Sequence, residues 1–348
     1  GYLRDEPRSN EAALKYVIYG AFSTGIMLFG FSLLYGLTGT LDLYGLHTVF
    51  AAGGGDKLTI FVALLLVLAG IGYKIAFVPF HFWVPDVYEG APIPVGAYLS
   101  IAPKAAGVAL FLRFLVTAFG GVDALDWTLL EGINFPLLLG VLAAVTMTIG
   151  NLMALPQENL KRLLGYSSIA HMGYVMIGIA VFTEAGSAAA LFYTAVYLFM
   201  NLGAFHVVAI VANRYGESIT HYKGLIWRAP LIAVPMAIFL FALTGVPPTV
   251  GFIGKFYLFA EAIEVKMYWL ALIGALNSVI SLYYYARVIK SMVAPAPEGE
   301  TPPRFNTLDT PVWSVTLLLA LVIPTLLLGV YWEPLKIFAH ASLQMALH

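Results

Sequence analysis

The sequence predicts an all-α, polytopic membrane protein folded as a helix bundle, and three observations support this class. Of the 348 residues, 60% are hydrophobic and only 11% are charged, against about 25% in an ordinary soluble domain. The mean hydropathy is +0.86, too high for a water-exposed globule of this size. The apolar residues form continuous runs of about 20 residues, the length that one helix needs to cross a bilayer. A transmembrane β-barrel would show ~10-residue alternating segments instead.

The composition also excludes several classes of function. The formal net charge is −1, so the charge indicates neither a nucleic-acid binder nor a polybasic membrane-surface protein. It has no cysteine, which excludes disulfides, thiolate zinc sites and Cys-ligated iron–sulfur clusters on this chain. Any electron-transfer chemistry must therefore take place on partner subunits.

Nine apolar spans follow one another without a globular domain between them, so we expect one transmembrane domain over 1–348. The chain opens on Gly1 and a polar run, with no signal peptide, which we interpret as a chain whose earlier residues are absent. An acidic loop follows the third span, and a hydrophilic Pro-rich linker, 294–310, precedes the last. The predicted spans are 11–36, 57–79, 94–118, 134–155, 163–183, 187–212, 229–260, 267–293 and 311–334. The acidic loop contains Asp123, Asp126 and Glu131.

The loop cations alternate with the spans and predict the orientation. Cytoplasmic loops carry an excess of Lys and Arg, and nine spans place the two termini on opposite sides. We therefore expect a cytoplasmic N-terminus. The N-terminal side carries Arg4, Arg8, Lys161, Arg162, Arg214, Lys223, Arg228, Arg287, Lys290 and Arg304, and the other side only Lys57, Lys266 and Lys336.

Five further cations lie inside the spans. An ionisable residue near the bilayer centre costs about 2.5–3.5 kcal/mol, so such residues usually have a function. Arg113 can reach the interface from the end of its helix. Lys15 has Glu11 one turn before it. A helix ion pair and a place in a proton pathway are therefore equally good interpretations of this lysine. For the other three, Lys74, Lys104 and Lys255, a proton pathway is favoured over buried ion pairs that only fix helix packing.

Two spans are interrupted in related ways, at 72–86 and 244–255. Proline breaks the hydrogen-bond ladder of a helix, and broken backbone at membrane depth survives only where protein or water satisfies it. Two interrupted helices, each with a lysine nearby, are the pattern of a transport site in an inverted-repeat fold. The breaks contain Pro79, Pro247, Pro248 and Gly251.

The histidines do not predict a metal or haem site. Those in or beside spans, at 81, 171 and 206, lack metal-ligand spacing on one helix; we expect His47, His221, His340 and His348 in loops or at the chain end. His171 follows several hydroxyl side chains on one helix, so a proton relay and a plain hydrogen bond are equally open. We expect the aromatic run 283–285 to pack or to lie in the interfacial belt.

Long motifs then point to a family. The segments are 73–92 (YKIAFVPFHFWVPDVYEGAP), 150–174 (GNLMALPQENLKRLLGYSSIAHMGY) and 251–256 (GFIGKF). They resemble the antiporter-like subunits of complex I, the proton-pumping NADH:quinone oxidoreductase, over nearly the whole chain. The opening EAALKY at 11–16 and NLMAL at 151–155 resemble subunit N more than subunits L or M.

The resemblance implies a fold of fourteen core helices with two inverted five-helix repeats, of which the nine spans match helices six to fourteen. It also implies that Lys74, Lys104 and Lys255 are proton-channel lysines and that Lys15 is the sixth-helix lysine. The family's fifth-helix glutamate, the partner of the lysine that matches Lys74, lies upstream of Gly1. We therefore expect Lys74 to face the bundle interior with no acidic residue of this chain in salt-bridge distance.

The function that follows is proton translocation across a prokaryotic inner membrane, as subunit N of an NADH:quinone oxidoreductase whose quinone is reduced elsewhere. FMN, iron–sulfur clusters and quinone would belong to the complex, and no cofactor to this chain. Lys74 would exchange a proton as its carboxylate moves, Lys104 would connect two half-channels, and Lys255 would pass the proton to the far side. Subunits K and M and lipids are the expected partners, with no nucleic acid.

Three other functions remain open. A subunit of a multi-subunit cation/proton antiporter or of a membrane-bound hydrogenase would share this module. An independent solute carrier would need specific polar groups at both breaks, where we find one lysine each. A structural spacer would tolerate replacement of the buried lysines.

Overall fold

The computed structural model describes residues 3, 5–120, 134–295 and 311–347, and the acidic loop and most of the Pro-rich linker lie outside them. Regular structure in the described residues is helical, with one isolated bridge between Asn159 and Ser218. The helices are α1 Pro7–Thr38, α2 Leu43–Ala51, α3 Lys57–Ile75, α4 Trp83–Gly90, α5 Ile93–Phe119, α6 Phe135–Ala154, α7 Leu160–Ala180, α8 Glu184–Tyr215, η1 Ile219–Tyr222, α9 Leu225–Arg228, α10 Pro230–Thr244, α11 Val250–Glu264, α12 Tyr268–Val293, α13 Val312–Val330 and α14 Glu333–Leu347.

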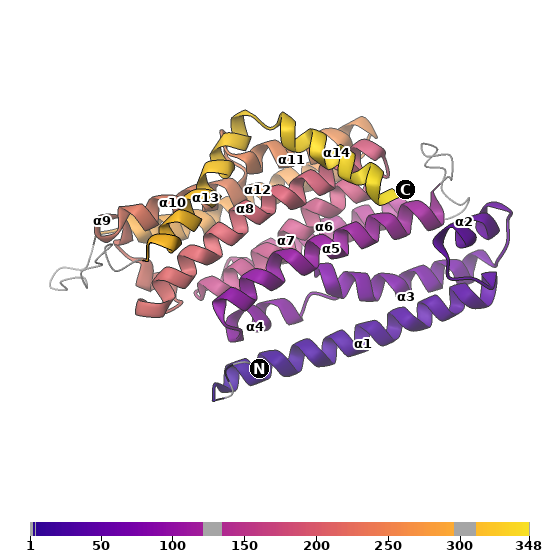
Figure 1. Cartoon of the computed structure of the whole chain (residues 1–348), viewed down its shortest axis with the longest axis horizontal. Helices are drawn as coiled ribbons and strands as arrows, with labels where there is room; N and C mark the ends of the chain where they lie inside the picture. Colours follow the sequence, from indigo (N-terminus) through magenta and orange to yellow (C-terminus); the bar gives the residue numbers. More distant parts are fainter. Residues whose placement is uncertain (1–2, 4, 121–133, 296–310, 348) are drawn as a thin grey trace.

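The long helices run roughly along one direction, with α1 at one edge of the bundle and α13 and α14 at the other (Figure 1). Eight helices in the described part are long and apolar enough to cross a membrane: α1, α3, α5, α6, α7, α8, α12 and α13. The predicted span 229–260 corresponds instead to two shorter helices, α10 and α11. The all-α membrane fold predicted from composition is therefore confirmed.

Polar residues just before the helices fix where several of them begin. The Asn159 side chain accepts hydrogen bonds from the backbone N–H groups of Lys161 and Arg162 at the start of α7. Asp56 does the same for α3, where hydrogen bonds from the Thr59 side chain and backbone hold the pKa of the Asp56 carboxyl below its usual value. These side chains satisfy N–H groups that have no partner inside the helix.

Helix α7 forms the centre of the bundle. All of its residues are buried except Arg162, which is half-buried. Gly150 of α6 and Gly173 of α7 allow the two helices to approach closely: a Cβ at Gly150 would lie 2.6 Å from the Ala170 nitrogen, and one at Gly173 2.6 Å from the Met147 nitrogen. Small residues at such crossings are typical of membrane helices.

Both expected interruptions are present. Helix α3 ends at Ile75, four residues earlier than predicted, because Ala76 adopts a left-handed conformation (φ 65°), and Pro79 lies in the segment before α4. Helix α10 ends at Thr244, followed by Gly245 at φ 89°. Pro247 and Pro248 lie in the second connection, and Gly251 is in the first turn of α11.

Two of the helices that the sequence analysis missed, α2 and α14, lie next to membrane-length helices. The short α2 joins α1 to α3, and α14 follows α13 and packs against α8 and α5. His47, His221 and His340 lie outside the eight membrane-length helices, as expected, but in the short elements α2, η1 and α14 rather than in irregular loops. His348 is outside the described residues.

The cation-rich connections meet at one end of the bundle. The Leu160 N–H donates to the Glu217 carbonyl (2.9 Å), which joins the α6–α7 loop to the segment after α8. The Gly224 N–H donates to the Ser291 carbonyl (3.1 Å), and Arg287 of α12 donates to the Gln157 carbonyl. The start of α1, α4 and α9 lie at this end too (Figure 1). The described cations that the loop alternation assigned to one side therefore share one end.

Candidate functional site: a buried polar line along helix α7

One face of α7 carries hydroxyl and imidazole groups into the middle of the bundle. His171 follows Ser167 by four residues and Ser168 by three, and Tyr174 follows His171 by three, so these side chains lie towards one side of the helix. All four are buried. Such a polar face inside an apolar bundle must be hydrogen-bonded to be stable.

Lys104 lies at one end of this line. Its side chain is 1% exposed. The ammonium Nζ donates to Ser168 Oγ (2.6 Å) and to the Ser168 carbonyl (3.3 Å), and lies 5.9 Å from the centre of the Tyr88 ring. Helix α5, which carries Pro103 directly before this lysine, thus holds a cation against the central helix.

His171 continues the line through two tyrosines from other helices. Its Nδ1 is 2.8 Å from the Tyr193 hydroxyl of α8, and its Nε2 is 3.3 Å from the Tyr285 hydroxyl of α12. The Tyr285 hydroxyl also hydrogen-bonds the Ser167 hydroxyl. A neutral imidazole donates through one nitrogen and accepts through the other, so this geometry can pass a proton from one neighbour to the next.

Lys255 lies at the other end, in α11 just after the break. It is 4% exposed. Its Nζ donates to the Thr244 carbonyl (2.8 Å) and to Ser278 Oγ (3.2 Å), and Ser278 in turn donates to the Tyr174 hydroxyl (3.2 Å). Thr244 is the last residue of α10, so the ammonium binds a carbonyl that the broken helix leaves without an intrahelical partner. Tyr174 adds its ring face, 4.3 Å from Nζ.

A second polar branch lies beside this line. Tyr284 donates to Asn151 Oδ1 (2.9 Å), Asn151 donates to Asn277 Oδ1 (3.0 Å), and Asn277 donates to Thr148 Oγ1 (3.1 Å). The Asn and Tyr side chains are buried. The branch ties α6 to α12 and uses the tyrosine next to Tyr285.

Lys74 is not where the sequence analysis placed it. It occupies the last turn of α3, but its side chain is exposed, so the expectation that it faces the bundle interior is wrong for this chain. Its stem lies against α5, where a Cβ at Gly107 would meet Lys74 Cγ at 3.2 Å. None of the ion pairs within the described ranges includes Lys74. Helix α3 packs against α1 and α5, and neither covers this ammonium.

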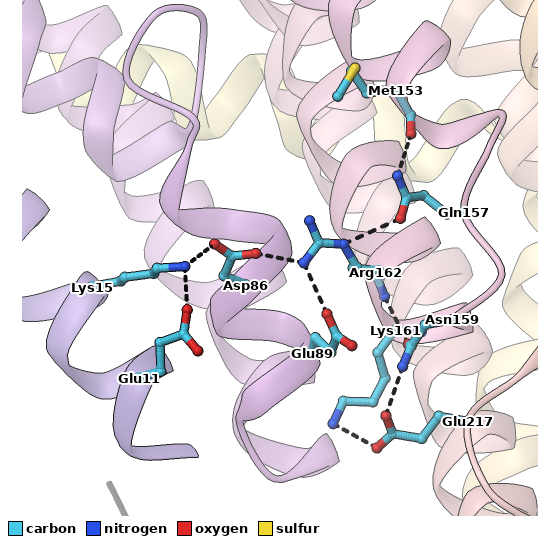
Figure 2. Close-up of polar contacts among 10 residues, drawn as sticks. All are labelled: Glu11, Lys15, Asp86, Glu89, Met153, Gln157, Asn159, Lys161, Arg162 and Glu217. Carbon is cyan, nitrogen blue, oxygen red and sulfur yellow. Dashed lines mark hydrogen bonds and ion pairs between the residues drawn. The ribbon is translucent and has the colours of Figure 1, made fainter. Parts of the chain in front are cut away.

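Lys15 belongs to a different cluster, at the cation-rich end. Figure 2 shows its ammonium between Glu11 Oε1 and Asp86 Oδ2, each 2.6 Å away. Asp86 also accepts from Arg162 Nη1 (2.5 Å), which in turn contacts Glu89 Oε2 (2.9 Å). The pair with Glu11 that the spacing suggested is present, but it is one part of a five-residue network.

The network fixes α4 between two helices. Asp86 and Glu89 stand on α4, Lys15 comes from α1 and Arg162 from the first turn of α7. Next to it, Lys161 Nζ pairs with Glu217 Oε1 (2.8 Å) and donates to the Ala91 carbonyl (2.9 Å). The short helix after the first break is therefore tied to the central helix by charged groups.

Several of these residues escaped the sequence analysis. Tyr284 and Tyr285 pack in the core as expected, but the hydrogen bonds of their buried hydroxyl groups were missed, and Tyr283 is 65% exposed. A helix in a bundle buries only part of its circumference, and position alone in a three-tyrosine run does not indicate which part. Arg113 is exposed. In the parts of the chain that the structure describes, no cluster of His, Asp and Glu could hold a metal ion.

Comparisons with known proteins agree with this architecture. The family model described as "NADH:quinone oxidoreductase/Mrp antiporter, TM" matches residues 1–281. The chain therefore belongs to this family of transmembrane antiporter-like subunits.

The chain is also similar to individual named subunits of NADH-quinone oxidoreductase. The chain is 48% identical to NADH-quinone oxidoreductase subunit N 2 of Sorangium cellulosum over 354 residues, covering 99% of this chain and 68% of the relative. It is 48% identical to subunit N of Chlorobium chlorochromatii over 346 residues, covering 98% and 67%.

Solved structures show the same fold. A chain of respiratory complex I from Thermus thermophilus, solved with bound aureothin, matches with a TM-score of 0.76 and 33% identity, over 96% of this chain and 70% of that one. A chain of the Mrp complex from Dietzia matches with a TM-score of 0.83 at 22% identity, over 99% of this chain and 71% of that one. At that identity the second match shows the fold alone.

Proposed function

We propose that this chain conducts protons across a prokaryotic inner membrane as the subunit N of an NADH:quinone oxidoreductase. The observation that carries the proposal is the buried line along α7, which has Lys104 near one end and Lys255 near the other. In the described residues neither lysine forms an ion pair with a carboxylate. The names of its relatives support the assignment to this enzyme.

The proposed proton path uses groups that can both take and give a proton. Lys104 passes a proton towards the α7 face through the Ser168 hydroxyl. His171 exchanges protons with Tyr193 and Tyr285, and Lys255 receives the proton through Ser278 and Tyr174. Lysine suits both ends because its charge can be removed when its surroundings change, whereas arginine stays protonated.

Lys255 has the clearest way to hold its charge. The Thr244 carbonyl lies at the C-terminal end of α10, where the helix dipole favours a cation. A shift of α11 relative to α10 would separate Nζ from this carbonyl and make proton release easier. The break at Pro247 and Pro248 therefore supplies the movable joint in the proposal.

Lys74 enters the proposal with a partner from outside this chain. Its exposed ammonium sits beside the first break, and the described part of the chain offers it no carboxylate. A carboxylate on a neighbouring helix would cover it, pair with it, and make a two-state element whose opening releases the proton. Lys15, which already has two carboxylates, fits a fixed ion pair better than a carrier.

The redox chemistry belongs to other subunits. FMN, iron–sulfur clusters and quinone would sit elsewhere in the complex, and a chain without cysteine cannot ligate a cluster through thiolates. We propose subunits K and M as the direct neighbours.

A cation/proton antiporter subunit is the second candidate. The fold matches the Mrp complex, and a chain of an archaeal membrane-bound sulfane sulfur reductase matches with a TM-score of 0.84 at 25% identity. Copurification separates the two. NADH-oxidising subunits in the complex that forms with this chain support the first function, and antiporter subunits without them contradict it.

The proton path is tested by replacing Lys104 with alanine in the intact complex. Proton pumping into vesicles and NADH-driven quinone reduction should both fall, while the complex still assembles. Normal pumping in an assembled Lys104→Ala complex would show that the α7 line is structural only.

A further inference from the structure

We infer that a groove between α5, α8 and α13 binds one anionic phospholipid, with an acyl chain along its apolar length and the phosphate at Arg214. The groove has a volume of about 840 Å³. Its walls come from residues 93–102 of α5, 198–214 of α8 and 311–317 around the start of α13. It lies outside the α7 line and depends only on the chain spanning a membrane, so it is independent of proton transfer.

The groove is apolar along most of its length and polar at one end. Leu198, Leu202 and Phe205 are typical of its α8 wall, and Ile101 of its α5 wall. Among the described residues that line it, Arg214 is the charged one, and it lies in the last turn of α8 next to Asn213. This end is the cation-rich end of the bundle, where anionic headgroups are attracted to basic pockets between membrane helices.

The depth of the groove fits half a bilayer. From Leu198 to Arg214, α8 advances about 24 Å at 1.5 Å per residue. Half of a bilayer measures roughly 20–22 Å with its headgroup region. The groove therefore runs from headgroup level to near the bilayer centre, which is the reach of one acyl chain with its phosphate.

The size of the groove suits a small hydrophobic ligand. Its volume of about 840 Å³ falls inside the range of about 300–1,000 Å³ that is usual for small-molecule sites. A flexible hydrocarbon chain fits a long apolar groove of this volume.

Two aromatic residues border the groove towards the lipid. Tyr98 of α5 is 62% exposed and Trp313 of α13 is 67% exposed. Such side chains prefer the membrane–water interface, with the ring in the apolar region and the polar atom in water. His206 of α8 makes the groove floor rigid, because it is hydrogen-bonded to Ser314 at 3.0 Å.

The test uses the whole complex reconstituted in vesicles with a photoactivatable acyl chain on either phosphatidylglycerol or phosphatidylcholine. We expect phosphatidylglycerol to label the peptides of α5 and α8 about five-fold more than phosphatidylcholine, the factor that about 1 kcal/mol per cation gives near an anionic headgroup. Arg214→Gln should reduce the ratio to about one. Lys223→Gln, an exposed cation at the same end, should leave it unchanged.

A second variant tests the apolar part. Ala102→Trp places a large ring into the groove from an exposed position of α5, and should remove the labelling by both lipids from these peptides. Equal labelling by the two lipids in the unmodified complex would overturn the proposal. The proposal would also be overturned if an added isoprenoid quinone displaced the label and added phospholipid did not. It would be overturned as well if a neighbouring subunit covered the groove, so that neither lipid labelled it.

Discussion

Lys255 and Lys74 both lie beside a break in a helix, yet their ammonium groups have opposite surroundings. Lys255 follows its break and turns back to the last carbonyl of α10, in the bundle. Lys74 precedes its break and points outward from the last turn of α3. Among the described residues, the first lysine is therefore buried against a carbonyl and a hydroxyl that accept from its ammonium, and the second is exposed.

We predict that Lys255→Ala in the intact complex lowers proton pumping and coupled quinone reduction roughly ten-fold, or about 1.4 kcal/mol in the barrier. Lys255→Arg should also impair both, because arginine does not release its proton. The exposed Lys290 is the matched control, and its replacement by alanine should have no effect. Full activity in an assembled Lys255→Ala complex would exclude this lysine from the path.

The neighbouring tyrosines of α12 allow a buried hydroxyl group to be compared with an exposed one. Tyr285→Phe removes one hydroxyl that binds both Ser167 and His171, and leaves the ring packing unchanged. We predict several-fold slower pumping with normal assembly. Tyr283→Phe changes an exposed ring and should leave the rate of proton pumping unchanged. If the two variants pump equally well, His171 is a hydrogen-bonded core residue and not a relay.

At the scale of elements, the ion-pair network explains how α4 keeps its position after an irregular segment. The two carboxylates of α4 contact Lys15 on one side and Arg162 on the other (Figure 2). The groups are 24–33% exposed apart from Glu11, at 62%. Exposed ion pairs contribute little to stability. Charge-assisted hydrogen bonds that a planar guanidinium makes within a network contribute more.

We predict that Arg162→Gln destabilises the assembled subunit by about 1.5–3 kcal/mol, the usual contribution of hydrogen bonds to charged groups. Thermal unfolding of the complex, followed by the solubility of this chain, measures the loss. Asp86→Asn should show a similar loss, and the double variant less than the sum of the two, because the residues share one interaction. Strict additivity would mean that the contact contributes nothing, and Lys223→Gln serves as the neutral comparison.

The sequence predicted the spans well and the ends of elements poorly. Long apolar runs identify membrane helices because the bilayer itself sets their length. The end of α3 depends on one left-handed residue, Ala76, which no composition signals. The inner face of α12 could not be assigned either, because it depends on where α6 and α7 lie across the bundle.

At the scale of the whole molecule, the two ends of the bundle differ in charge. Contacts between the α6–α7 loop, the segment after α8 and the end of α12 place Lys161, Lys223 and Lys290 at one end. The opposite end holds α2, the start of α8 and the C-terminal helix (Figure 1). The bundle thus has a fixed direction in the membrane, although the sequence alone could show this only as an alternation along the chain.

The orientation follows from that difference, and reporter fusions can measure it. Cations are retained on the cytoplasmic side during insertion, so we predict a cytoplasmic signal from a reporter placed before Lys161 or at Lys223. A reporter at Glu184, which begins α8 at the other end, should report the far side. A far-side signal from the Lys161 loop would contradict the prediction. The loops at Lys161 and Lys223 touch through Leu160 and Glu217. The two fusions must therefore report the same side of the membrane. If they report different sides, the chain does not cross the membrane an even number of times between them.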